Sequence, residues 1–129
     1  MSSYLTFYIE KKDDESISLE ILSVSRNSEL YQSLSEHIYA GQKIELTKEI
    51  VKQAIEEIRA EVYKAKARID EYYNHLPDKL DDRMQMIDNV ISLKEDMCEM
   101  EQTWHDLLFI YDIVEQTSYN DNKVVVEID

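Results

Sequence analysis

The sequence predicts an α+β fold, mainly α: a long antiparallel helical hairpin, coiled-coil-like, with a short helix and a small antiparallel β-sheet at its base. Apolar side chains recur at alternating spacings of four and three residues in two long central stretches, which is typical of paired helices. Two segments near the N-terminus alternate as strands do, and an apolar run near the C-terminus predicts one more strand. One glycine and one proline in 129 residues leave few tight turns, so helix should dominate.

The first element expected is a β-hairpin within residues 1–25. Leu5, Phe7 and Ile9 fall on one face of an alternating segment, and a second alternation follows from Ile17 to Val24. The loop between them contains no Asn-Gly type signal, so the sequence leaves the register of the hairpin unspecified.

A short amphipathic helix is predicted for residues 27–40. Asn27 or Ser28 can cap its first turn, and Gly41 stands where a helix usually stops. Its apolar positions share helical spacing and are Leu30, Tyr31, Leu34 and Ile38.

Two long helices are predicted at residues 47–76 and 79–117. Thr47 and Asp78 are the expected N-caps, and Pro77 ends the first helix. The first seam is Val51, Ile55, Ile58, Val62, Ala65, Ile69, Tyr72 and Leu76. The second is Met86, Val90, Leu93, Met97, Met100, Trp104, Leu107, Tyr111 and Val114.

Residues 123–128 are predicted to form a third strand that would pair with the N-terminal hairpin, although terminal segments also stay loose. The apolar residues of this segment are Val124, Val125, Val126 and Ile128. Residues 104–114 are apolar almost all round the helix, which predicts burial on several sides. The sheet and short helix should therefore pack there, and the turn at Pro77 should be the free tip.

Size and composition predict one domain, 1–129, in a reducing compartment. The only cysteine, Cys98, cannot pair within the chain. No secretory pattern opens the sequence, and no eighteen consecutive residues are apolar. We therefore expect a soluble cytoplasmic protein that does not bind membranes.

The net charge of −14 is concentrated on the second long helix. Residues 80–117 hold ten acids against two bases, whereas 47–76 are balanced. Pairing of Lys52, Arg59 and Lys66 with Asp96 and Glu101 across the hairpin would use some of these charges. The remaining unpaired acidic residues repel nucleic acid, and they either keep the helix solvated or recognise a basic surface.

No constellation predicts catalysis, and we expect neither enzyme activity nor a cofactor or metal. Phosphate loops, dinucleotide fingerprints and nucleophile elbows are missing from the sequence. Glu71 with His75 and Glu101 with His105 stand at i and i+4, which is typical of solvated surface pairs rather than of inward-facing carboxylate sites. His37 has no partner close in sequence.

A second apolar set lies on the tip half of the second long helix, displaced from the seam: Leu80, Met84, Ile87 and Ile91. Tyr72 and Tyr73 lie near it in the predicted hairpin, and aromatic and methionine side chains are enriched at interfaces. A two-helix hairpin cannot bury both sets. Either a second copy or another protein covers it, or the short helix folds along the hairpin and covers it internally.

The opening segment Met1 to Tyr8, with Ser25 and Arg26 later, resembles the start of small acidic uncharacterised proteins of tailed phages and prophages. The resemblance covers about a fifth of the chain and transfers no site residues. It implies a bacterial host cytoplasm and either virion assembly or the blocking of a host factor.

The sequence thus predicts a protein–protein interaction module whose acidic helix face and apolar set bind a basic host protein, as anti-CRISPR-like inhibitors of nucleic-acid-dependent factors do. A homodimer is expected. The acids assigned to the interface are Glu95, Glu99, Glu101 and Asp106. The alternative is a structural or assembly component with no inhibitory role.

Overall fold

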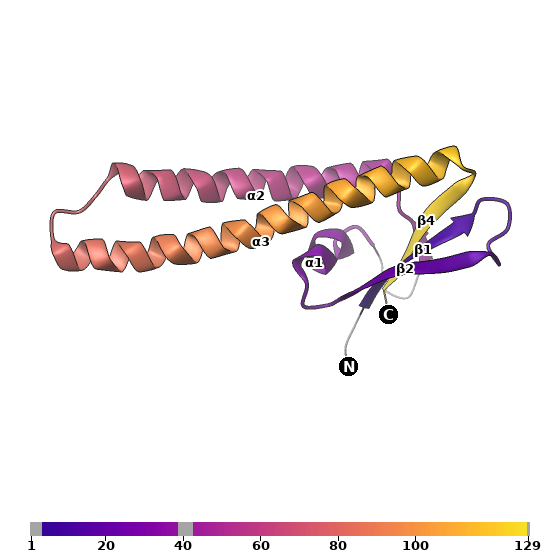
Figure 1. Cartoon of the computed structure of the whole chain (residues 1–129), viewed down its shortest axis with the longest axis horizontal. Helices are drawn as coiled ribbons and strands as arrows, with labels where there is room; N and C mark the ends of the chain where they lie inside the picture. The colour runs from indigo at the N-terminus through magenta and orange to yellow at the C-terminus, as the bar shows by residue number, and fades with distance from the viewer. Residues whose placement is uncertain (1–3, 39–42, 129) are drawn as a thin grey trace.

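The computed structural model describes residues 4–38 and 43–128, and it has the predicted α+β architecture dominated by helix (Figure 1). Two long helices run antiparallel, and a small sheet and a short helix pack at one end of the pair. In chain order the elements are β1 (Tyr4–Lys11), β2 (Ser18–Ser25), α1 (Glu29–Ser35), β3 (Lys43–Glu45), α2 (Lys48–Asn74), α3 (Leu80–Tyr119) and β4 (Asn122–Ile128).

The sheet is antiparallel, with strand order β2, β1, β4, β3. β1 and β2 form the predicted hairpin, with an irregularity between Phe7 and Tyr8. The last strand is also confirmed, because β4 pairs with β1 and places Phe7 opposite Val126. We expected three strands; β3 is a fourth, only three residues long and therefore too short to produce an alternating pattern.

Side-chain caps start the first two helices. The hydroxyls of Ser28 and Thr47 accept hydrogen bonds from backbone amides three residues later, at 3.1 and 3.3 Å. The expected cap at Asp78 is wrong, because α3 begins one residue later and Lys79 occupies the N-cap position without a side-chain hydrogen bond.

The short helix α1 ends at Ser35, earlier than predicted. Gly41, the expected stop, lies outside the described residues. Leu30, Leu34 and Ile38 are buried in one core with Leu5 and Phe7, together with the base half of the hairpin. The segment therefore packs at the base and does not extend along the hairpin toward the tip (Figure 1). The alternative in which the short helix covers the second apolar set is thus wrong.

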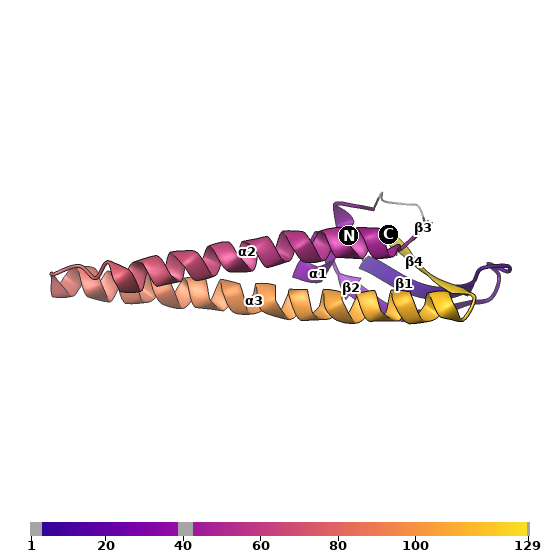
Figure 2. The same cartoon turned by 90° about the horizontal axis from the view of Figure 1, so that it is seen from above.

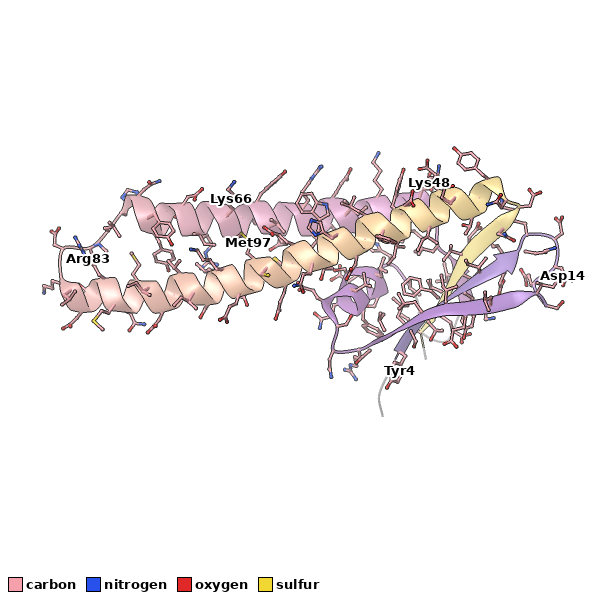
Figure 3. The ribbon with its side chains drawn as sticks, viewed as in Figure 1. Tyr4, Asp14, Lys48, Lys66, Arg83 and Met97 are labelled. Atoms are coloured by element: carbon pink, nitrogen blue, oxygen red, sulfur yellow. The ribbon has the colours of Figure 1, made fainter. Side chains whose placement is uncertain are left out.

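Apart from Leu76, the predicted seams lie between α2 and α3, which are about 40 and 60 Å long by helical rise. Figure 2 shows the two helices side by side along most of their length. In Figure 3, Met97 lies between them and Arg83 lies at the tip. Near the tip the interior is a second, small cluster of Ile69, Met86 and Val90.

The turn at Pro77 is the free end of the hairpin, as predicted (Figure 1). The Nε of Arg83 donates a hydrogen bond of 2.6 Å to the carbonyl oxygen of Pro77, which closes the turn onto α3. Leu76, the last residue of the first predicted seam, follows the end of α2 and is exposed. The seam therefore loses its cover before the turn.

The side chains of residues 104–114 at the base of α3 are less completely buried than their apolar composition predicts. Leu107, Ile110 and Val114 are buried in the main core, but Leu108 and Phe109 are 46% and 72% exposed. The reason is that α2 covers one side of α3 while α1 and the sheet cover a second, which leaves the third side open.

Candidate functional site

The predicted apolar set is exposed on α3. Its members share one side of the helix, by their spacing of four and three residues, and their exposed fractions are 72% for Leu80, 59% for Met84, 54% for Ile87 and 50% for Ile91. We call these four residues the apolar stripe. No element other than α2 lies beside this half of α3 in Figures 1 and 2. The internal cover that the sequence left open does not form within the described residues.

The two tyrosines assigned to the interface have different surroundings. Tyr72 is half-buried and packs against Ile69 and its neighbours inside the hairpin. Tyr73 is exposed, and the Nζ of Lys94 donates a hydrogen bond of 2.9 Å to its hydroxyl while lying 5.3 Å from its ring centroid. The structure therefore assigns Tyr72 to the hairpin interior and Tyr73 to a polar contact between the helices.

The acids of α3 meet a carboxylate of α1 at a groove of about 560 Å³. Glu29 of α1 and Asp96, Glu99 and Asp106 of α3 line this groove, and we call these four residues and the hollow between them the acidic groove. The side chain of Thr103, which is 5% exposed, also lines the groove. None of the four carboxylates takes part in an ion pair with another residue of 4–38 or 43–128.

Of the four acids predicted from the sequence, two line this groove and two do not. Glu99 and Asp106 line it, Glu95 is exposed outside it, and Glu101 is half-buried. Two residues along a helix turn the side chain by about 200°, so Glu99 and Glu101 cannot share one face. Glu29 was not predicted because its contact with α3 depends on how α1 docks.

Burial and charge repulsion both raise the pKa of Glu29. Desolvation is the main cause that raises the pKa of its carboxyl group, and the charges of Glu99 and Asp96 add to it. Partial burial and the neighbouring carboxylates together therefore disfavour the ionised form of Glu29.

The predicted ion pairs between the long helices do not form. Among the described residues, the ion pair that joins α2 to α3 is Lys48 with Glu115, at 3.8 Å. Asp96 lies instead in the acidic groove beside Glu29. The basic positions Lys52 and Arg59 are exposed and have no ion-pair partner among the described residues.

The histidines divide into one inner and two outer positions. His75 is exposed next to Glu71, and His105 is exposed and stacks on Trp104 with ring centroids 6.4 Å apart. His37 is different, because its side chain is 16% exposed and its Nε2 lies 3.6 Å from an Oε2 of Glu57. The sequence could not reveal this pair, since His37 lies in the turn after α1 and Glu57 lies on α2, twenty positions later.

Comparison with protein-family models, with curated proteins and with solved structures finds no match to this chain. Within the described ranges, neither long helix carries an apolar stretch sufficient to cross a lipid bilayer.

Proposed function

We propose that this protein is a non-enzymatic binding module that engages a basic protein surface through the acidic groove and the adjacent apolar stripe. The observation that carries the proposal is the groove, where four carboxylates from two helices face one hollow without a cation in ion-pair distance among the described residues. A lysine or arginine entering the groove would relieve this repulsion. The same charge disfavours direct binding of nucleic acid.

The stripe and the groove form one continuous surface on α3. Asp81, Asp88 and Glu95 recur at seven-residue intervals, so they follow one edge of the apolar stripe. This acidic edge leads from the tip toward the groove, which begins at Asp96. A partner with apolar side chains bordered by lysine or arginine would complement both the stripe and its edge.

The class of partner follows from the charge. Proteins that act on nucleic acid carry basic surfaces that neutralise phosphate. We therefore extend the proposal to a nucleic-acid-dependent host or defence factor, blocked in an anti-CRISPR-like manner in the cytoplasm of a bacterial host. The resemblance of the opening segment to phage proteins is consistent with this setting.

The exposed stripe also supports a second candidate, a structural or assembly component. Two copies of the chain would bury Leu80, Met84, Ile87 and Ile91 against each other as a homodimer. In this reading the acids of α3 only keep the surface solvated. Ionic strength separates the two candidates, because electrostatic recognition weakens with salt and apolar association persists.

The test is a pull-down from a bacterial host followed by titration of the purified partner. One variant combines Glu99→Lys with Asp106→Lys, and its matched control combines Asp112→Lys with Glu56→Lys. All four positions are exposed, and both variants have the same net charge. Far-UV circular dichroism checks that helicity is retained.

We expect the groove variant to lose at least tenfold in affinity, because each reversed charge repels the cation it should bind, while the control keeps wild-type affinity at equal ionic strength. Equal losses in both variants would attribute binding to net charge and not to the groove. Binding that survives the groove variant and moderate salt would favour the assembly role.

A further inference from the structure

Outside the acidic groove, one cluster of side chains in the described residues has the composition of a metal site. Glu36 and His37, at the end of α1, and Glu57 of α2 each offer a ligand atom, and these atoms lie within 4.8 Å of one another. The sequence predicted no metal site, because Glu57 is twenty positions from His37 and no local spacing links them. Docking of α1 on α2 creates the cluster.

The imidazole of His37 supplies an independent observation. Its Nε2 atom is buried and has no hydrogen-bond partner among the described residues. The nearest carboxylate oxygen, Oε2 of Glu57, lies at 3.6 Å, which is beyond hydrogen-bond distance. A buried ring nitrogen without a partner is costly, and an ion bound to it would remove that cost.

The spacing of these two atoms is compatible with two ligands on one ion. Zinc binds histidine nitrogen and carboxylate oxygen at about 2.1 Å, so two ligands in tetrahedral geometry lie about 3.4 Å apart. The Nε2 of His37 and the Oε2 of Glu57 are 3.6 Å apart. Glu36 lies within the same group and could reach the ion by a change of side-chain rotamer, since it is exposed.

The surroundings favour a cation. Glu29, Glu36, Glu57 and Glu61 line a hollow of about 400 Å³ between α1 and α2. Of these four acids, only Glu61 is paired with a lysine in the part of the chain that the structure describes. The negative potential would attract a divalent ion, and the imidazole nitrogen selects a transition ion over magnesium or calcium.

We propose that Glu36, His37 and Glu57 bind one Zn²⁺ ion, with water completing the coordination, and that the ion fastens the end of α1 to α2. None of the three proposed ligands lines the acidic groove, although Glu29 of α1 lines both hollows. The Zn²⁺ test therefore changes different residues from the partner test, and its failure would not by itself contradict the proposed binding function.

The experiment is calorimetric titration of the untagged protein with Zn²⁺, together with metal analysis after dialysis. We expect one ion per chain and a higher melting temperature in its presence. His37→Gln and Glu57→Gln should each weaken Zn²⁺ binding by about tenfold or more. The matched controls are His105→Gln and Glu101→Gln, which alter an acid and histidine pair on α3 and should leave Zn²⁺ affinity unchanged.

Circular dichroism of each variant without metal shows whether it folds, and the glutamine replacements keep the side chains polar to protect the fold. Absence of stoichiometric Zn²⁺ binding overturns the proposal and leaves His37 and Glu57 as a simple ion pair. Binding that is unchanged in His37→Gln, or that is equally lost in His105→Gln, overturns it as well.

Discussion

Replacing Ile87 and Ile91 with glutamate tests whether the apolar stripe is surface or core. The two side chains are 54% and 50% exposed, whereas their neighbour Val90 is 5% exposed and faces α2. Val90→Glu is therefore the matched control on the same turn of the same helix. We expect the double variant Ile87→Glu with Ile91→Glu to fold and the control to lose the tip of the hairpin.

The magnitude follows from these exposures. Complete burial of one isoleucine side chain stabilises the folded state by about 1.5–3 kcal/mol. Ile87 and Ile91 are each about half-buried, so together they contribute about as much as one fully buried isoleucine. Glutamate keeps part of this contact through its methylene groups and has a better helix propensity. The double variant should therefore lower the unfolding free energy by about 1 kcal/mol. Val90→Glu places a charge in the tip cluster and should lower it by at least about 3 kcal/mol.

Urea unfolding followed by far-UV circular dichroism measures both changes, and sedimentation velocity at the same concentrations reports association. If the wild type is a homodimer through the stripe, the double variant should sediment as a folded monomer. A double variant as unstable as Val90→Glu at a concentration where the wild type is monomeric would refute the reasoning, because the stripe would then be internal core.

Three further predictions concern stability. Because the folded pKa of Glu29 is raised, its ionised carboxylate disfavours the folded state at pH 7. Glu29→Gln should therefore have a higher urea midpoint than the wild type at pH 7. This difference should vanish when the pH is lowered through the folded pKa of Glu29, to a pH of about 4. Lys43→Ala should lower the unfolding free energy by about 1–3 kcal/mol, because Glu10, which is 3% exposed, loses its partner at 3.3 Å. Adding Glu10→Gln to this variant should restore most of the lost free energy. A double variant as unstable as Lys43→Ala would refute the pairing argument. Leu107→Ala should lower the unfolding free energy by about 2–5 kcal/mol, because the Leu107 side chain is fully buried. Phe109→Ala should lower it by less than about 0.5 kcal/mol, because Phe109 is 72% exposed. Similar losses for the two variants in chemical unfolding would contradict the described packing.

Much of the candidate surface was readable from the chain. The stripe is exposed where its displacement from the seam predicted, and Glu99 and Asp106 face a common groove. Glu101 lies outside this groove, because two residues along a helix separate it from Glu99 by about 200° around the axis. The ion pairs expected for Asp96 failed for a related reason, since α1 takes up the side of α3 on which Asp96 lies.

The sequence by itself determined the local structure: two seams, two caps, the turn at Pro77, the β-hairpin and the last strand. These features are decided by residues a few positions apart, and periodicity records which face of each element is apolar. It does not record what covers that face. Only docking of α1 and the sheet decided that Phe109 stays exposed, that Glu29 meets Glu99, and that His37 meets Glu57. Those contacts join residues far apart in the chain, and their positions depend on how whole elements share the limited surface at the base of the hairpin.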